Sequence, residues 1–436
     1  MTSEKTAPTE TIIRIAILAE EPISWGSGKH YFLKILNNYH WTHKNIQYTF
    51  EATYIYDTDL LNERLTTNNY DVLLVPGGGV GDGQAIMKGF TLLKSVKQWK
   101  KYIQDFTLHG GGYVGICGGT ALFTGLYTGK EKYETFAERQ YQKSTLNISC
   151  VNSYYKDLAL PLFYPHQKRH PEKIGATGYV FSFAPGIAQD NKHLFTGGIP
   201  LDFQINTTHP IFSGVSTKTI RIRWWGGPAL HLPTTPDREL AILAKYPKQE
   251  ISDNPNTQLH AWKYTGGLYG LIKAFLKAAA LIKKEKDSLS NLLLYTYYLA
   301  SPWKQTPSLI NLDFSDKPSI TAEIYPNTHQ GRILLCTSHP EYMIWHGGTI
   351  TEMPESPDRS LATGLHQWKD ITPLSKTMEN EVMHTWWLVR RFVAWAAKIP
   401  DTHMPPIEQT KPADGLEKLI SENIYDGKLI NQIKNI

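Results

Sequence analysis

The sequence predicts an α/β fold built on a mostly parallel sheet with helices on both faces. In the first third of the chain, short β-branched runs alternate with longer stretches of helical periodicity. Such alternation is typical of parallel strands joined by crossover helices. Glycine-rich turns also follow directly on two of the apolar runs, where the strands of an α/β sheet end and its sites are usually built.

Each element of this fold is predicted by its own local pattern. The elements expected in the first third are, in chain order, strand 12–18, helix 30–39, strand 70–75, helix 85–109, strand 113–116 and a helix that begins at 118. Gly110 is placed to stop the long helix, because glycine readily adopts the left-handed conformation that ends helices. The later elements expected are strands 218–225, 239–246, 319–325 and 331–345 and a core helix within 380–398.

Length predicts an elaborated domain, because 436 residues exceed the roughly 250 to 300 residues that one hydrophobic core usually serves. We expect a flexible N-terminus at 1–11, one domain over 12–399, and a linker with a C-terminal helix at 400–436. A helical pattern at about 254–306 predicts an insertion in that domain. The hydrophobic fraction of 41% is that of an ordinary globular protein.

Charge and cysteine content exclude several kinds of function. The 45 basic and 40 acidic residues leave a net charge of +5, too small and too scattered to predict nucleic-acid binding. Three cysteines without a C-x-x-C pair predict neither a disulfide framework nor a cysteine-rich zinc site, so we expect a reducing, cytoplasmic setting. Residues 268–282 carry Lys273 and Lys277, which favours an amphipathic helix over a membrane span. We therefore expect no metal, no cofactor and no membrane partner.

Cys117 is the first candidate catalytic residue. It lies in GGGYVGICGGTALFTG, between an expected strand and an expected helix, and Gly115 and Gly119 frame it as G-x-C-x-G. Glycines are needed at a sharp strand-to-helix turn, because side chains there would collide with the crossing backbone. A neutral thiol is a weak nucleophile and a helix end alone lowers its pKa too little, so a base must lie nearby.

His339 and Glu341 supply the expected base and its partner. Both lie in SHPEY, after an apolar strand. Pro340 disfavours a helical conformation at His339, and side chains two residues apart in an extended segment share a face. The carboxylate can therefore orient the imidazole and stabilise the imidazolium. These residues predict a Cys-His-Glu triad.

Glycines also predict hydrogen-bond donors for a developing oxyanion. Gly77, Gly78 and Gly79 follow the expected strand 70–75, where bare backbone N–H groups could point at the reacting oxygen together with that of Gly118. Trp225, Gly226 and Gly227 are the remaining candidates for substrate contact. Trp224 and Trp225 could line a substrate cleft beside these glycines, but two aromatic residues on opposite faces of a strand more often make one core and one surface contact.

The order VPGGG, GGGYVGICGG and SHPEY resembles the class I glutamine amidotransferase-like superfamily, and most closely the branch found as the N-terminal domain of some biotin protein ligases. RWWGGPAL at 223–230 and LAILAKY are similar to that branch too. The resemblance implies a flavodoxin-like sheet, with Cys117 as nucleophile, His339 as general base and acid, Glu341 as its orienting partner, and Gly78 and Gly118 as oxyanion donors. Residues outside the resemblance include the helical insertion.

Two functions remain open on this reading. The first is a cysteine-dependent amide hydrolase or amidotransferase-like protein, which takes a small-molecule amide and forms a thioester on Cys117. No ligase or synthase domain is recognisable beside it, so released ammonia would need a separate synthase or acceptor protein. The second is a non-catalytic module that binds a small molecule or a protein on the same fold.

Overall fold

The computed structural model describes about three fifths of the chain. The described residues are 9–19, 27–77, 94–129, 139, 142–143, 145–154, 199–224, 227–248, 258–285, 292, 296, 299–300, 302–311, 314–341, 344–345, 382–383 and 385–408. Of the expected site, Gly78, Gly79, Trp225 and Gly226 lie outside these residues.

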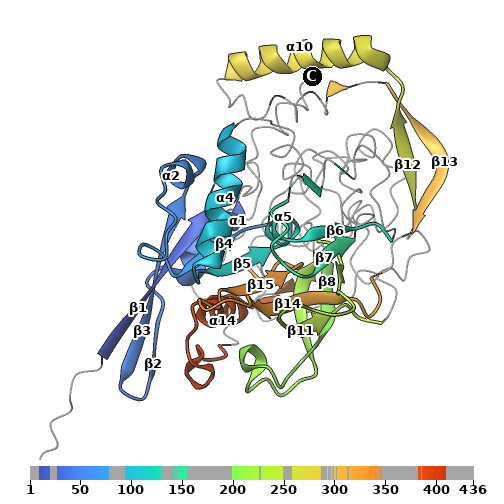
Figure 1. The fold of residues 1–436 in the computed structure, drawn as a ribbon. Coiled ribbons are helices and arrows are strands. Elements are labelled where there is room, and N and C mark those ends of the chain that lie inside the picture. Colours follow the sequence, from blue (N-terminus) through green and yellow to red (C-terminus); the bar gives the residue numbers. More distant parts are fainter. Residues whose placement is uncertain are drawn as a thin grey trace, which may run out of the picture.

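A ten-stranded sheet forms the centre of the described structure, in the order β2-β3-β1-β4-β5-β15-β14-β11-β8-β9 (Figure 1). Its strands are β1 (Thr9–Leu18), β2 (His40–His43), β3 (Ile46–Ile55), β4 (Val72–Val75), β5 (Gly112–Ile116), β8 (Ile199–Ile205), β9 (Thr219–Trp224), β11 (Glu239–Lys245), β14 (Pro318–Ile324) and β15 (Arg332–Cys336). The five neighbours β3, β1, β4, β5 and β15 run parallel. The outer pairings are antiparallel. The expected α/β fold with a large, mostly parallel central sheet is confirmed in these five strands.

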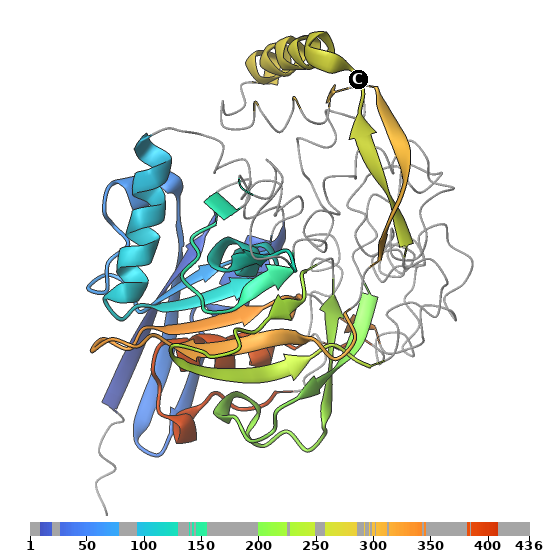
Figure 2. The ribbon, with the colours of Figure 1, turned by 45° about the vertical axis from the view of Figure 1, so that its right-hand side comes forward.

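Helices cover both faces of the parallel strands. They are α1 (Ser27–Leu36), α2 (Asp57–Leu61), α4 (Lys94–Leu108), α5 (Gly118–Phe123) and α14 (Trp386–Ala396). Alternate side chains of each strand enter two different cores, since successive strand residues point to opposite faces. In β4, Val72 and Leu74 pack with α1 and α14, whereas Leu73 and Val75 pack with α4 and α5. Figures 1 and 2 show α4 and α14 on opposite sides of the sheet.

Local sequence explains where the helices end. Gly110 has a φ of +96°, a conformation that glycine adopts at low cost, and α4 ends two residues before it. The helix α14 is buried almost all round, with Leu388, Val389, Phe392 and Val393 closed to solvent. Burial of each such side chain contributes roughly 1.5–3 kcal/mol, so α14 is a core element.

Smaller elements lie outside the main sheet. A three-stranded sheet joins β10 (Leu230–His231), β7 (Asn152–Tyr154) and β6 (Gly125–Tyr127), and β16 (Ile344–Trp345) pairs with β17 (Val382–Met383). The region of the expected helical insertion contains α10 (Gly267–Glu285), which lies between the antiparallel strands β12 (Gln258–Tyr264) and β13 (Trp303–Asn311). Figures 1 and 2 both show α10 at the outer end of this strand pair, away from the sheet.

Two short 3-10 turns complete the described structure, at Pro210–Phe212 and Asp401–His403. The second packs on the β2-β3 pair, where Trp41 Nε1 donates to the carbonyl of His403 at 2.8 Å. No described helix is long and apolar enough to cross a bilayer.

Candidate active site

Three adjacent strands bring the candidate residues together at one edge of the sheet. β4, β5 and β15 are neighbours and parallel, so their carboxyl ends meet at the same edge. Gly77 lies two residues beyond the end of β4, Cys117 directly after β5, and His339 three residues beyond β15. The fold therefore joins segments that are far apart in the chain.

Cys117 occupies a strained turn between β5 and α5. Its φ of +48° and ψ of −104° lie in a region that non-glycine residues rarely adopt, at a cost of roughly 1–3 kcal/mol. The turn is held from both sides: the Cys117 N–H donates to the carbonyl of Cys336 at 2.7 Å, and the Ala121 N–H donates to the carbonyl of Cys117 at 3.1 Å. This geometry is that of a nucleophile elbow.

The glycines that frame Cys117 are required by close backbone contacts. A Cβ on Gly119 would lie 2.1 Å from the carbonyl oxygen of Val75, and a Cβ on Gly115 would lie 2.8 Å from the carbonyl group of Gly119. Real Cβ atoms essentially never come this close to backbone atoms. The expectation that side chains at these positions would collide with crossing backbone is confirmed.

Thr120 and Tyr113 tie the elbow to the sheet. Thr120 Oγ1 lies 2.9 Å from the carbonyl oxygens of both Gly115 and Cys336, and Tyr113 donates its hydroxyl hydrogen to the carbonyl of Gly119 at 2.7 Å. All these groups are buried, so the hydrogen bonds are not exchanged with water and hold the turn in place.

Gly77 marks the point where the thiol and imidazole approach each other. A Cβ built on Gly77 would lie 2.6 Å from Cε1 of His339 and 2.8 Å from Cβ of Cys117. The two atoms are therefore at most about 5.4 Å apart, the sum of these distances, so the two side chains lie close to each other beside Gly77. Only a residue without a side chain fits between them.

His339 and Glu341 form the expected pair. Nδ1 of His339 lies 2.7 Å from Oε1 of Glu341, and both side chains are buried, 3% and 0% exposed as residues. An ionised carboxylate only accepts hydrogen bonds, so this contact assigns the hydrogen to Nδ1 and leaves Nε2 as the basic nitrogen. The interpretation of Glu341 as the partner that orients the imidazole agrees with this contact.

The backbone of the His-Pro-Glu segment is clamped by residues that sequence reasoning missed. The His339 N–H donates to the carbonyl of Arg223 at 2.7 Å. Thr385 Oγ1 donates to the carbonyl of Pro340, and Trp386 Nε1 donates to that of Glu341, each at 2.9 Å. These donors at the start of α14 follow the segment by about 45 residues, and nothing in the local sequence points to them.

Gly227 packs closely against the backbone of the segment that leads to His339, and its expected contact with substrate stays a prediction. A Cβ there would lie 1.7 Å from the carbonyl oxygen of Thr337, and its nearest atoms all belong to that residue. Tyr246 reinforces the contact, because its hydroxyl lies 2.7 Å from Thr337 Oγ1 and 3.2 Å from the Gly227 carbonyl oxygen. Gly227 thus supports the segment that carries His339. The neighbouring Trp224 is a core residue, fully buried beside Phe314.

Gly118 is the first residue of α5 and is buried directly after Cys117. The first N–H groups of a helix have no partner inside it, so the backbone of Gly118 remains a candidate oxyanion donor. Among the described residues, no group of three or more His, Cys, Asp or Glu side chains could hold a metal ion.

The other two cysteines lie in environments that suppress their reactivity. All three cysteines are free. Burial, and secondarily the charge of Glu323, raises the pKa of Cys150 to about 12. Burial also raises the pKa of Cys336 well above its usual range. Both are protonated at neutral pH, as expected of packing thiols.

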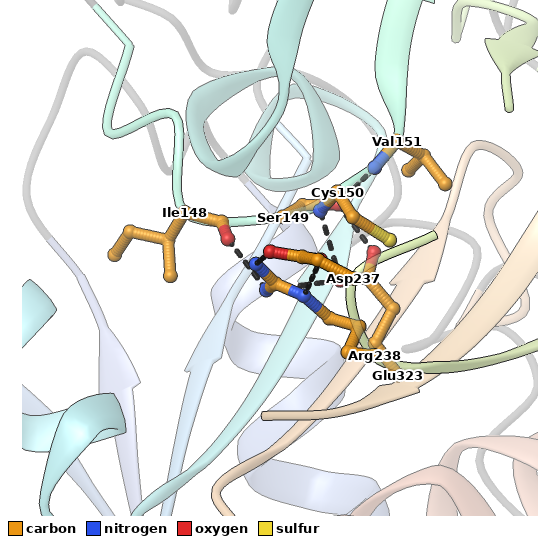
Figure 3. A network of polar contacts seen from close by, with 7 residues as sticks. All are labelled: Ile148, Ser149, Cys150, Val151, Asp237, Arg238 and Glu323. Atoms are coloured by element: carbon orange, nitrogen blue, oxygen red, sulfur yellow. Dashed lines mark hydrogen bonds and ion pairs between the residues drawn. The ribbon is translucent and has the colours of Figure 1, made fainter. Parts of the chain in front are cut away.

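A second buried carboxylate, that of Glu323, is the centre of a network of polar contacts (Figure 3). Glu323 on β14 accepts hydrogen bonds from the Ser149 hydroxyl and, at 3.0 Å, from the Cys150 N–H, and it pairs with Arg238 at 3.5 Å. Arg238 also donates to the carbonyl of Ile148 at 2.8 Å. Burial raises the pKa of Glu323, and these donors only partly oppose the shift. The network joins the 148–151 segment to the sheet.

No protein-family model matches the chain, and no curated protein matches it significantly. The chemistry of the site is therefore interpreted from its own geometry.

Proposed function

We propose that the protein is a cysteine-dependent amide hydrolase or an amidotransferase-like protein that uses Cys117, His339 and Glu341. The observation that carries the proposal is the convergence at Gly77, where Cβ of Cys117 and Cε1 of His339 lie 2.8 and 2.6 Å from one point. A strained cysteine beside an imidazole that is held by a buried carboxylate is the arrangement of an activated nucleophile.

The fold supports the same proposal. In chain order, the parallel strands β3, β1, β4, β5 and β15 have the arrangement 2-1-3-4-5, which is that of flavodoxin-like sheets. This order agrees with the sequence resemblance to the class I glutamine amidotransferase-like superfamily. In this proposal, the two glycine-rich segments and the His-Pro-Glu segment together form the active site that the superfamily resemblance implies.

The proposed reaction has two steps. Sγ of Cys117 attacks the carbonyl carbon of a carboxamide while its proton passes to Nε2 of His339, and Glu341 stabilises the imidazolium. Backbone N–H groups, that of Gly118 among them, stabilise the oxyanion. His339 then protonates the leaving amine and a thioester forms. Water, deprotonated by His339, attacks the thioester and releases the carboxylic acid and the thiol.

The substrate in this proposal is a small-molecule amide, such as glutamine or a γ-glutamyl compound. If the released ammonia is transferred, a separate synthase or acceptor protein takes it. Three cysteines that form no disulfide fit the reducing cytoplasmic setting that a thiol nucleophile needs. A ligand-binding module without turnover is the alternative outcome of the experiment below.

Competition between the cysteines for iodoacetamide at pH 6.5 tests the proposal. Cys117 is only 4% exposed, whereas Cys150 is partly exposed, so access alone favours labelling of Cys150. With a pKa of about 12, Cys150 is a thiolate in on the order of one molecule in 10⁵ at pH 7. Its labelling should rise about tenfold per pH unit above that, since only the thiolate reacts.

We expect Cys117 to be labelled first at pH 6.5, as measured by peptide mass spectrometry, and His339→Gln to abolish this preference. Glutamine, γ-glutamyl peptides and simple amides, tested against wild type and Cys117→Ala, then identify turnover. Slow labelling of Cys117 that His339→Gln leaves unchanged would contradict an activated thiol. Activated labelling without turnover of any amide, alone or with a partner protein, would favour a module that binds without chemistry.

A further inference from the structure

Exposed apolar side chains are concentrated on α10. Among the described residues, six of the eight large hydrophobic side chains that are exposed belong to this helix: Leu268, Tyr269, Leu271, Ile272, Phe275 and Leu276. We call these six residues the α10 strip. Members three and four positions apart are neighbours on a helix surface, so the strip is continuous. Soluble proteins rarely expose such a surface unless it binds something.

The apolar face of α10 is wider than the surface that covers it. At 100° per residue, the apolar residues of α10 span about 240° of the helix circumference. Only the sector around Ala274, Ala278 and Ile282 is buried. The remaining apolar sector faces outward over a helix of 19 residues, which is about 28 Å long.

Lysines border the exposed sector. Lys273, Lys277 and Lys284 lie along one edge of the strip, Lys283 lies at its end, and all four are exposed. Residues 267–284 contain no aspartate or glutamate. The carboxylate of α10 is that of Glu285, the last residue of the helix. A helix with an apolar face, lysines beside it and no carboxylate among them is suited to a surface that is apolar inside and negatively charged outside.

We propose that α10 lies flat on an anionic lipid bilayer, with the α10 strip at the level of the headgroups and its lysines on lipid phosphates. The figures show α10 at the outer end of the β12-β13 pair, where a plane can approach it (Figures 1 and 2). Lysine stems can lie along the apolar boundary while the ammonium groups contact the headgroups, and Tyr269 suits the same boundary.

The charge of α10 disfavours a second copy of the chain as the partner that covers the α10 strip. Two α10 strips packed together would bring the lysines of both copies into proximity, without a carboxylate from 267–284 to offset them. The proposal also departs from the sequence-based expectation of no membrane partner, which considered only a spanning segment. A helix that lies on a bilayer does not need to cross it.

Vesicle sedimentation of the full chain tests this proposal, with vesicles of phosphatidylcholine alone or with added phosphatidylglycerol. We expect the protein to sediment with the anionic vesicles, less so with the neutral ones, and to be released by salt. Ile272→Gln with Leu276→Gln should weaken binding about tenfold or more. Lys273→Gln with Lys277→Gln should weaken binding to anionic vesicles by roughly thirtyfold.

Ile12→Gln provides the matched control. Ile12 is 45% exposed and Ile272 is 49% exposed. Ile12 belongs to β1, a strand that Figures 1 and 2 show far from α10. Ile12→Gln should bind vesicles like wild type, and thermal unfolding of every variant reports whether it folds. Equal binding of wild type and the α10 variants would overturn the proposal. So would a wild-type dimer in light scattering that Ile272→Gln with Leu276→Gln converts to monomer, because the strip would then be a self-association surface.

Discussion

Two buried glutamates on neighbouring parts of the sheet have very different surroundings. Glu323 on β14 and Glu341 beyond β15 are both fully buried. Glu323 is contacted by a hydroxyl, a backbone N–H and a guanidinium. The side chain of Glu341 bonds to His339 through Oε1, and its Oε2 accepts no hydrogen bond from the described residues.

Under the proposed function, Glu341 is a functional carboxylate and Glu323 a structural one, and their surroundings differ accordingly. A buried carboxylate with several donors holds segments together, because the loss of any one partner leaves the others in place. A buried carboxylate whose main partner is an imidazole makes a charge on that imidazole favourable. We therefore expect the two glutamates to respond in opposite ways to the same substitution.

Substitution of each glutamate by glutamine is the strongest test of this comparison. Glu341→Gln should lower any hydrolytic turnover about 10³–10⁴-fold, because the amide does not stabilise the imidazolium or select its tautomer. It should also slow alkylation of Cys117 while leaving the thermal unfolding midpoint nearly unchanged. Glu323→Gln should destabilise the fold by about 1–3 kcal/mol while leaving the reactivity of Cys117 intact. Denaturant unfolding measures the stability of both variants, and alkylation measures the reactivity of Cys117 in both. Equal effects of the two substitutions would remove the distinction.

Gly77→Ala sharpens the comparison, because it changes the room between Cys117 and His339 and leaves the charges of the site unchanged. The new methyl group would lie 2.6 Å from Cε1 of His339, so the imidazole must move and the preferential alkylation of Cys117 should be lost. Overpacking should cost about 1–3 kcal/mol in denaturant unfolding.

Gly112→Ala is its control, since a Cβ there would lie 2.4 Å from the carbonyl oxygen of Ala396, at the opposite end of β5. It should cost comparable stability without changing the relative labelling of the cysteines. If both variants altered Cys117 alike, the effect of Gly77→Ala would be general destabilisation.

Thr385→Val should have the smallest effect. Valine keeps the shape of threonine but removes the hydroxyl that donates to the carbonyl of Pro340 at 2.9 Å. We expect a loss of about 0.5–1.5 kcal/mol in unfolding free energy and a modest decrease in the alkylation rate of Cys117, because the His339 segment is held less firmly. Thr385→Ser retains the donor and should restore the alkylation rate. Failure of serine to do so would assign the effect to packing.

Local pattern predicted the elements of the site better than the elements around it. The strands β4 and β5, which precede Gly77 and Cys117, are short apolar runs followed by turn residues, and both lie where the pattern placed them. The expected strand 331–345 was too long: β15 ends at Cys336, three residues before His339, and Ile344–Trp345 belongs to a separate small sheet. The strands β12 and β13 were not predicted within the helical pattern at about 254–306. Local sequence pattern predicts the strands of an isolated pair poorly, because the stability of such strands depends on cross-strand contacts.

The width of the apolar face of α10 was readable from the sequence, but its exposure was not. Periodicity predicts a helix with one side suited to burial. It does not indicate how much of that side the rest of the chain covers, because coverage depends on which elements reach the helix in space.

By itself, the sequence determined the parallel α/β core, the glycines required at the turn around Cys117, and the pairing of His339 with Glu341 across one proline. All three were predicted from patterns of residues close in the chain, although the backbone that Gly119 must clear belongs to Val75 of β4. Only the tertiary structure decided that β4, β5 and β15 are neighbours, that Gly77 lies between the thiol and the imidazole, and that Thr385 and Trp386 clamp the His-Pro-Glu backbone. These contacts join segments tens to hundreds of residues apart, and packing of the whole core selects them.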